Sequence, residues 1–380
     1  MATQADTAVV VGTVSDYLTA KGDAKLYNIN LPAGVYLQAQ LTTPANADLD
    51  YDLYLLDAEG NILTGSDYYT YINGTAGTLP EALGYITSGD TATYYLYVLA
   101  SEGGSVSESF TLDYSVSTAC DSYEIDESVR QALAFTYGAG GAYIESRNLS
   151  SPIDNDWYVI TVPSSRIYDK LKISATTAST NTCSVEVYQN VASEGYQMKR
   201  VGSGNTISVS SGKYYIRVSN AKTMENFDDL DIQNYKLSIT PILKATGIVI
   251  TDLKGSEGLN KVVNYPGYGA HFRTQGSGTL TVYGVLTATD SSTGVTYAVG
   301  GEQINGLYYS PAWEANNTSA NAIRRGTGTT DSSGKFEIDI SLPPGIGVYS
   351  YYGSTSTHYF DICGVSVSPS DDSSISASET

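Results

Sequence analysis

The chain has 380 residues, with 20 basic against 40 acidic side chains, a net charge of −20 and a pI near 4.3. Polyanions repel such a protein, which disfavours nucleic acid and anionic membranes as partners and favours solubility and metal cations such as calcium. The length allows two or three domains with separate cores. Tyrosine is unusually frequent, with 33 Tyr against 6 Phe and 2 Trp, and it is typical of strands with half-exposed aromatic rings.

Residues 1–118 have the pattern of an antiparallel β-sandwich. Short alternating apolar segments are separated by turn residues such as Pro32-Ala33-Gly34, and this spacing is typical of sandwiches. The polar segment from Gly60 to about Thr78 predicts a loop. The predicted strands are Ala8 to Val14, Lys25 to Leu31, Val35 to Leu41, Asp50 to Leu56, Thr93 to Leu99 and Ser109 to Val116.

Residues 119–242 repeat this plan. Ser151 to Pro163 reads SPIDNDWYVITVP, and GDAKLYNINLP at 22–32 has Asp, Tyr, Ile and Pro at the same spacing; TYYLYV at 93–98 likewise corresponds to KYYIRV at 213–218. Self-similarity of this kind indicates tandem copies of one unit. After a lead-in from Asp121 to Ser150, the predicted strands are Asp156 to Val162, Lys170 to Ala175, Ser184 to Gln189, Lys213 to Ser219 and Asn234 to Thr240.

These motifs resemble a known family. DSYEIDES at 121–128, then DNDWYVITV and GKYYIRV, are similar to the bacterial pre-peptidase C-terminal domains, which are jelly-roll-like β-sandwiches on secreted peptidases and other exported proteins. The first copy has the strands but lacks the acidic lead-in and has Leu26 in place of Trp. The resemblance covers residues 1–242 and implies the fold more specifically than the function.

Residues 243–366 predict a third all-β unit. Gly334 supplies the positive φ that a hairpin needs before the last predicted strand. The pattern resembles carboxypeptidase-regulatory-like and other bacterial Ig-like domains, which are non-catalytic spacer and binding modules. The strands are predicted at Ala245 to Thr251, Thr279 to Thr289, Val295 to Val299 and Glu337 to Leu342. Residues 367–380 are Ser-rich and acidic and predict a disordered tail. The predicted fold class is therefore all-β: two tandem jelly-roll-like β-sandwiches plus a third, Ig-like β-sandwich.

Catalysis is disfavoured. The only histidines are His271 and His358, and the chain contains neither an HExxH nor a GxSxG pattern. A Ser-His-Asp site would need one of these two residues. Pairs of carboxylates are so abundant in this sequence that no particular pair can be identified as a glycosidase active site. We therefore predict that the chain is not an enzyme.

Calcium binding is the better candidate, because calcium prefers several oxygen ligands drawn from more than one segment. The acidic residues of the second copy meet this need if the lead-in folds back beside the strand. Collagen-binding members of the same family are similar in having an acidic linker that gathers calcium. The candidate ligands are Glu124, Asp126, Asp154 and Asp156 in the second copy and Asp48, Asp50 and Asp52 in the first. Otherwise these carboxylates are solvated edge charges, which also limit strand-to-strand aggregation.

Aromatic side chains supply candidates for ligand contact, with ordinary core packing as the alternative. Alternation along a strand places neighbouring tyrosines on opposite faces, so one set is expected to be exposed. A second group lies in a loop rich in Gly and Asn, where exposed aromatic residues suggest a contact surface. The candidates are Tyr95, Tyr97 and Tyr215 on strands and Tyr308, Tyr309 and Trp313 in the loop.

The three cysteines, Cys120, Cys183 and Cys363, are too few and too scattered for a zinc site or a disulfide scaffold. Either Cys120 pairs with Cys183, or all three are separate thiols. No segment is long and apolar enough to span a membrane, and no signal peptide is evident. The richness in Gly, Ser, Thr and Tyr still favours an extracellular location, secreted or attached to the cell surface.

The sequence therefore favours a non-catalytic, secreted or cell-surface bacterial protein for adhesion, binding or presentation. Its expected partner is an extracellular polysaccharide, protein polymer or protein surface. One alternative is a self-assembling fibre or surface-layer subunit, because edge strands suit strand addition between chains. Another is the accessory part of a secreted peptidase.

Overall fold

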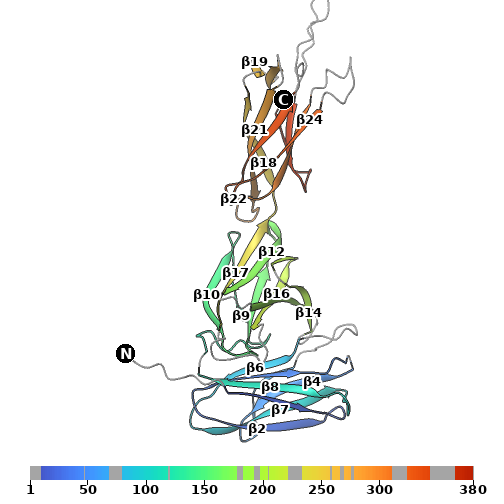
Figure 1. Cartoon of the computed structure of the whole chain (residues 1–380), viewed down its shortest axis with the longest axis vertical. Coiled ribbons are helices and arrows are strands. Elements are labelled where there is room, and N and C mark those ends of the chain that lie inside the picture. Colours follow the sequence, from blue (N-terminus) through green and yellow to red (C-terminus); the bar gives the residue numbers. More distant parts are fainter. Residues whose placement is uncertain are drawn as a thin grey trace, which may run out of the picture. The chain divides into compact units, whose positions relative to one another are not determined.

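The computed structural model describes residues 10–46, 48–67, 79–118, 120–177, 183–191, 197–203, 205–220, 233–256, 259–265, 269–274, 278–309, 323–342 and 364–379. Its secondary structure consists of strands β1 to β27 (Figure 1). No helix capable of crossing a membrane occurs in these ranges. The chain forms two compact units, one of residues 1–164 and 170–242 and the other of residues 165–169 and 243–380.

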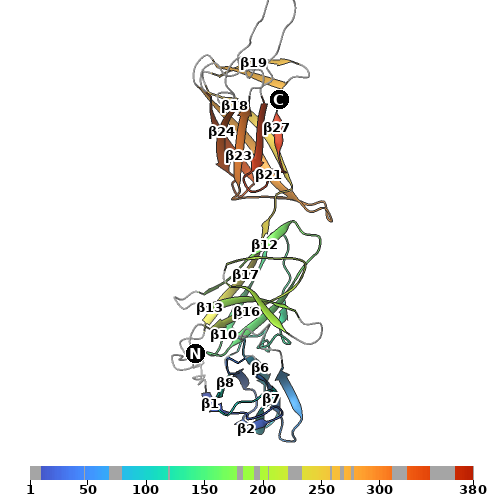
Figure 2. The same cartoon turned by 90° about the vertical axis from the view of Figure 1, so that its right-hand side faces the viewer.

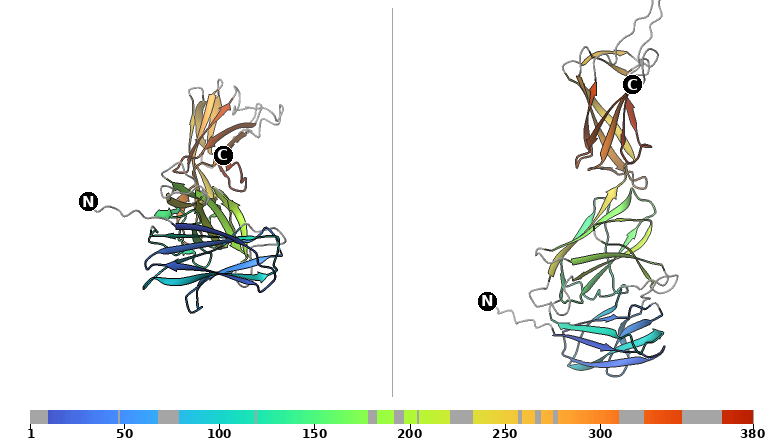
Figure 3. Two further views of the ribbon diagram at one scale, coloured as in Figure 1. Left: turned by 60° about the horizontal axis from the view of Figure 1, so that its bottom comes forward. Right: turned by 45° about the vertical axis from the view of Figure 1, so that its right-hand side comes forward.

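The first unit begins with a sandwich of two four-stranded antiparallel sheets, drawn in blue to cyan in Figures 1 and 3. Its strands are β1 (Val10–Asp16), β2 (Ala24–Leu31), β3 (Tyr36–Thr42), β4 (Asp50–Leu56), β5 (Ile62–Ser66), β6 (Glu81–Ile86), β7 (Ala92–Glu102) and β8 (Phe110–Ser117). The sheet orders are β1-β8-β3-β6 and β2-β7-β4-β5. Strand β5 lies in a segment that was predicted to be a loop. The strand was not predicted because alternation of apolar and polar residues is weak in its short ILTGS sequence.

Alternation along the strands builds the core of this first sandwich. Leu37, Ala39 and Leu41 of β3 point inward and are at most 2% exposed, as are Leu96 and Val98 of β7. Burial of each of these leucine and valine side chains stabilises the fold by about 1.5–3 kcal/mol. The alternate residues of the same strands therefore point outward, and the candidate site is built from them.

A second sandwich follows in the same unit. Its strands are β9 (Leu133–Ala134), β10 (Ala142–Leu149), β11 (Asn155–Val162), β12 (Tyr168–Thr177), β13 (Cys183–Asn190), β14 (Met198–Ser203), β15 (Thr206–Ser208), β16 (Gly212–Asn220) and β17 (Gln233–Leu243). The sheet orders are β10-β17-β12-β15 and β14-β13-β16-β11-β9. Apart from the added β9, this is the topology of the first sandwich.

The strand register is equivalent in the two sandwiches. Tyr27 of β2 pairs with Leu96 of β7. At the equivalent position Tyr158 of β11 pairs with Ile216 of β16. Since a slip of one residue would reverse every side chain, the shared register preserves which residues face the core and which face outward.

The second unit is also all-β and is shown from another side in Figure 2. Its strands are β18 (Gly247–Gly255), β19 (Leu259–Tyr265), β20 (Gly269–Thr274), β21 (Gly278–Thr289), β22 (Thr296–Ala298), β23 (Gln303–Tyr309), β24 (Ile323–Thr329), β25 (Lys335–Leu342), β26 (Gly364–Pro369) and β27 (Ala377–Glu379). One sheet joins β18, β22 and β25 to the long strand β21, another has the order β24-β23-β26-β27, and β19 pairs with β20. Gly334 has the predicted positive φ, at 74°.

The C-terminal segment corrects one prediction. Residues 367–380 were predicted to be a disordered tail, but β26 and β27 pair with each other and β26 pairs with β23. Val365 and Val367 are 3% and 2% exposed. Alternating valines supply a buried strand face, and the surrounding serines occupy the other face, so the Ser-rich composition does not prevent pairing.

Candidate functional site

The acidic lead-in of the second sandwich folds back beside β11. The backbone N–H of Trp157 donates to the carbonyl of Asp126 over 3.0 Å, and that of Phe135 donates to Val159 over 2.9 Å. Strand β9 then pairs with β11 in parallel. The folding-back on which the predicted site depended is therefore present, and it brings Glu124 and Asp126 to Asp154 and Asp156. We call these residues, together with Asp121, Glu127 and Arg147, the acidic cluster.

One half of the acidic cluster is paired with Arg147, whose side chain is fully buried. Its Nη1 lies 2.7 Å from Asp121 Oδ1, and its Nη2 lies 2.9 Å from Asp156 Oδ1 and also pairs with Asp126. Burial alone would lower the pKa of Arg147, but Asp156 and then Asp126 outweigh it and raise the pKa. The guanidinium is therefore a permanent cation in this half.

The other half is a junction triad of Glu124, Glu127 and Asp154, whose carboxylate oxygens lie within 4.8 Å of one another. Across the described ranges, no lysine or arginine forms an ion pair with any of the three. Two side chains of β3 reach the triad from the first sandwich. The Tyr36 hydroxyl lies 2.7 Å from Glu124 Oε2 and 2.6 Å from Glu127 Oε1, and Gln38 Nε2 donates to Glu127 Oε1 over 2.6 Å.

Hydrogen-bond donors reach both carboxylate oxygens of Glu127 and one oxygen each of Glu124 and Asp154, and they leave the other two oxygens without a partner. The single proton of the Tyr36 hydroxyl can be donated to only one carboxylate at a time. Glu124 Oε1 and Asp154 Oδ1 are buried without a donor, and so is the amide oxygen of Gln38, which is 1% exposed. Burial, followed by the charge of Asp154, raises the pKa of Glu124 to about 8 and that of Glu127 well above its usual value. Burial likewise raises the pKa of Asp154.

The donor set fits a hard divalent cation. Calcium takes six to eight oxygen ligands, from carboxylates, amide oxygens and water, and the junction triad offers three carboxylates beside an amide oxygen and a phenol oxygen. Burial without a counter-charge favours the protonated form of these carboxyl groups, as their raised pKa values indicate, and a bound cation would favour the ionised form instead. Of the predicted ligands, Glu124 and Asp154 belong to this half, whereas Asp126 and Asp156 pair with Arg147.

The acids predicted in the first copy form no comparable group. The described acidic side chains close enough to share an ion are confined to the lead-in and the start of β11, so Asp48, Asp50 and Asp52 are not among them. Asp48 precedes β4, and Asp52 is only 7% exposed. Its Oδ1 accepts from the Ser101 hydroxyl over 3.3 Å, and burial, then Asp50, raises its pKa to about 6.

The outer face of the sheet β2-β7-β4-β5 carries the strand tyrosines. Tyr97 lies between Leu26 and Tyr54 in register, and the rings of Tyr54 and Tyr97 are 6.1 Å apart at 39°. Tyr95 lies beside Leu56, which pairs with Ile62. Leu26 and Ile62 are 58% and 64% exposed, and the other four are half-buried. We call this surface the tyrosine platform: Leu26, Tyr54, Leu56, Ile62, Tyr95 and Tyr97.

The equivalent face of the second sandwich is covered. Trp157, which stands where Leu26 stands, is 1% exposed and packs with Tyr188, 3% exposed. Leu79 from the first sandwich and Val129 of the lead-in lie over them. Tyr215 belongs to the same cluster at 8% exposure, so the prediction that it contacts a ligand is corrected: the lead-in makes it a core residue.

The loop aromatics are also corrected in part. Tyr308 lies in β23 and is 1% exposed, so it packs in the core of the second unit rather than at a contact surface. Tyr309 ends the same strand, and its side chain, like all of Trp313, lies outside the described residues. His358 and the side chain of His271 lie outside them as well.

The two described cysteines are free thiols, so of the two alternatives the pairing of Cys120 with Cys183 is not formed and separate thiols are observed. Burial raises the pKa of Cys183 to about 12, with Asp156 a further cause. Burial followed by Glu124 raises the pKa of Cys120. Both thiols therefore stay protonated at neutral pH, which makes them weak nucleophiles. Cys363 lies outside the described residues.

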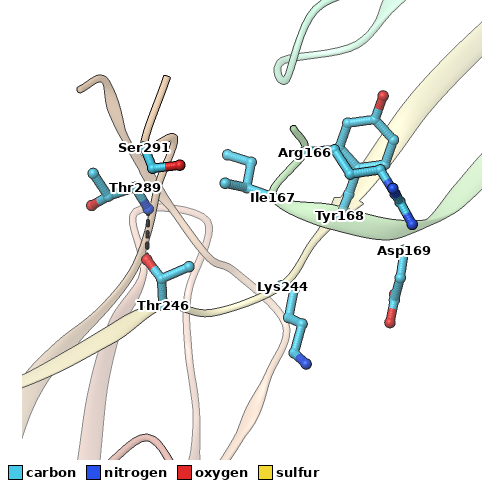
Figure 4. A pocket seen from close by; sticks show the side chains of 8 residues that line it. All are labelled: Arg166, Ile167, Tyr168, Asp169, Lys244, Thr246, Thr289 and Ser291. Carbon is cyan, nitrogen blue, oxygen red and sulfur yellow. Dashed lines mark hydrogen bonds between the residues drawn. The ribbon is translucent and has the colours of Figure 1, made fainter. Parts of the chain in front are cut away.

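The second unit has an open pocket of about 660 Å³ (Figure 4). The backbone N–H of Thr289 donates to the hydroxyl of Thr246 over 2.7 Å in its wall. Its lining residues are Arg166, Ile167, Tyr168, Asp169, Lys244, Thr246, Thr289 and Ser291. None of the predicted site residues is among them.

Four residues of the acidic cluster and its boundary were not predicted from the sequence: Tyr36, Gln38, Glu127 and Arg147. Glu127 could have been found, because it lies in the same DSYEIDES segment as Glu124 and Asp126. No sequence pattern identifies Tyr36 and Gln38 as site residues, because they lie on a strand with ordinary alternation, about ninety residues from the acidic residue that they contact.

No protein-family model matches the chain. A segment of 50 residues, 13% of this chain, is 44% identical to the uncharacterized protein YlqB of Bacillus subtilis (strain 168). The match spans 31% of that protein's length, and so it does not show a family.

Several solved β-rich structures are similar at a low level. The CUB1-EGF-CUB2 domains of human MASP-1/3 share 11% identity, over 61% of this chain and 99% of that one, with a TM-score of 0.18. The tandem CBM22 domains of Paenibacillus barcinonensis Xyn10C share 12%, over 63% and 92%, at 0.18. Sulfolobus turreted icosahedral virus shares 13%, over 64% and 96%, at 0.19. TM-scores this low support no functional argument, and the all-β class follows from the strands themselves.

Proposed function

We propose that this chain is a non-catalytic binding protein, secreted or attached to the cell surface, that holds an extracellular polymer on the tyrosine platform. The observation that carries the proposal is the contrast between the two copies. The second sandwich covers Trp157 and Tyr188 with its lead-in. The first sandwich leaves Leu26, Tyr54 and Tyr97 of the same face at the surface.

The shape and charge of the platform favour a neutral polysaccharide. Two adjacent tyrosine rings and the flanking leucine form a row across three neighbouring strands, which suits the flat faces of successive sugar rings. The Tyr54 ring lies over Gly65, where a side chain would overlap it, so β5 does not block the row. A net charge of −20 disfavours anionic polymers.

Calcium is the proposed structural cofactor, and the resemblance to pre-peptidase C-terminal domains supports both the ion and the extracellular setting. In this proposal Glu124, Glu127 and Asp154 hold the ion, while Asp126 and Asp156 remain with Arg147. A cation that binds only the native state raises the unfolding midpoint by mass action. Millimolar calcium should therefore raise the midpoint above its value in EDTA, and Asp154→Asn with Glu127→Gln should abolish the rise.

Co-sedimentation with insoluble neutral polysaccharides, such as cellulose and chitin, tests the binding role. We expect the wild type to sediment with at least one polymer, and Tyr97→Ala or Tyr54→Ala to reduce the bound fraction at least fivefold. Tyr143→Ala is the matched control, because Tyr143 is 61% exposed on β10 of the other sandwich. Equal losses for Tyr143→Ala and Tyr97→Ala would refute the platform.

Sizing at rising concentration separates binding from the alternative of self-assembly. A binding protein keeps its size with and without calcium, whereas a fibre or surface-layer subunit forms large species. Growth with concentration that Tyr97→Ala prevents would assign the platform to contact between copies instead of to a polymer.

A further inference from the structure

The first sandwich closes one side of the acidic cluster. Tyr36, Gln38 and Gln40 are the outward-facing residues of β3, yet Tyr36 and Gln38 are 2% and 1% exposed because the lead-in covers them. Asn155 Nδ2, at the start of β11, donates to Gln40 Oε1 over 3.3 Å. The two sandwiches therefore share a buried polar boundary within one compact unit.

Close approach across this boundary requires a glycine. Gly84 of β6 pairs with Gln38, and a Cβ built on it would lie 2.7 Å from both Glu127 Cγ and the Tyr36 hydroxyl oxygen. These separations are well inside van der Waals contact. The lead-in thus rests directly on the strand that carries Gln38.

The side-chain amide of Gln38 lies at the junction triad, where its nitrogen forms hydrogen bonds and its oxygen forms none. Its Nε2 donates to Glu127 Oε1, and a hydrogen bond from its side chain also lowers the pKa of Asp154 against the larger, raising effect of burial. Its Oε1 is buried and has no donor. An acceptor oxygen left unpaired at such a position costs about 1–3 kcal/mol, and an amide oxygen is a common calcium ligand.

We propose that Gln38 Oε1 completes the cation site, so that one bound calcium ion ties the first sandwich to the second. This inference rests on the calcium site proposed above and goes beyond it, because it makes the ion a latch between domains. Glu124, Glu127 and Asp154 supply the charge from the second sandwich, and Gln38 supplies a neutral oxygen from the first. Calcium concentration then sets how firmly the platform-bearing sandwich is attached.

Calcium affinity of the full chain tests the latch, measured by displacement of Tb³⁺ luminescence in wild type, Gln38→Met, Gln38→Glu and Gln40→Met. Gln38→Met keeps the size of the side chain but removes the oxygen, and we expect calcium affinity to fall at least tenfold. Gln38→Glu keeps an oxygen ligand and should stay within threefold of the wild type. Gln40→Met, the matched control, removes a boundary contact outside the junction triad and should also stay within threefold.

A second variant guards against misfolding of Gln38→Met. Gly84→Ala changes the identity of no proposed ligand, but its Cβ would push Glu127 and Tyr36 away from β6, and calcium affinity should again fall. If the wild type binds calcium and Gln38→Met binds it equally well, the latch is overturned while the calcium site stands, whatever the affinity of Gly84→Ala. If the wild type itself does not bind calcium, the calcium site of the proposed function fails too, and polymer binding by the platform remains a separate test.

Discussion

Replacement of Arg147 by methionine is the sharpest test of how the acidic cluster is organised. The side chain is fully buried, and it is the cationic partner of Asp121, Asp126 and Asp156. Removing one partner of a buried ion pair typically costs about 3–5 kcal/mol, because the remaining charge is left uncompensated. In a unit of this size 1 kcal/mol corresponds to about 2–4 °C, so we expect the unfolding midpoint to fall by about 6–20 °C.

The assay is urea and thermal unfolding in EDTA, which removes any contribution of a bound ion. Arg130→Met is the matched control, because Arg130 is 47% exposed and its ion pair with Asp67 lies at the surface; such pairs contribute about 0–1 kcal/mol. Adding Asp126→Asn and Asp156→Asn to Arg147→Met removes two of the three carboxylates left without their cation, and we expect it to restore at least half of the loss. A loss below about 1 kcal/mol for Arg147→Met, or no recovery in the triple variant, would refute the reasoning.

Two further predictions concern other parts of the chain. Burial and the neighbouring Asp50 raise the pKa of Asp52 to about 6, above its unfolded value, so its contribution to stability is greatest at low pH and is lost as pH rises through 6. In urea unfolding, the free energy of unfolding of Asp52→Asn should therefore rise relative to that of the wild type as the pH increases from 4 to 7. A fall relative to the wild type would contradict the raised pKa. In the second unit Gly284→Ala would overlap the Phe336 ring and should cost about 1–3 kcal/mol, whereas Gly247→Ala, with its nearest atom at 3.3 Å, should cost less; equal losses would contradict the packing.

The fold of the tandem sandwiches could be predicted because it depends on local pattern and repetition. Alternating residues in 22–32 and 151–163 define strands with the same register in both copies. Short strands such as β5 and β15 were missed, because three to five residues give too little alternation to be recognised. The β26 segment was misjudged because composition was given more weight than its two alternating valines.

The candidate site could be predicted only where its residues lie in one motif. Glu124, Asp126, Asp154 and Asp156 were found because an acidic lead-in precedes an acidic strand. Gln38 was not, since its role depends on which face of β3 the lead-in covers, and this is decided by tertiary packing.

Tyr215 was assigned the wrong environment for the same reason. Alternation predicts that two residues share a face but does not predict what covers that face.

The contrast between the two sandwiches supports the proposal that the tyrosine platform contacts a partner. Where Tyr97 and Tyr54 are neighbours in the first sandwich, Arg217 and Glu186 form an ion pair of 3.2 Å in the second. The covered face thus carries a charged pair, while the uncovered face carries an aromatic one. A sheet face that had only lost its covering segment would gain no stability from exposed apolar side chains, and polar residues would be tolerated there. Aromatic residues at these solvent-facing positions are therefore better explained by contact with a partner.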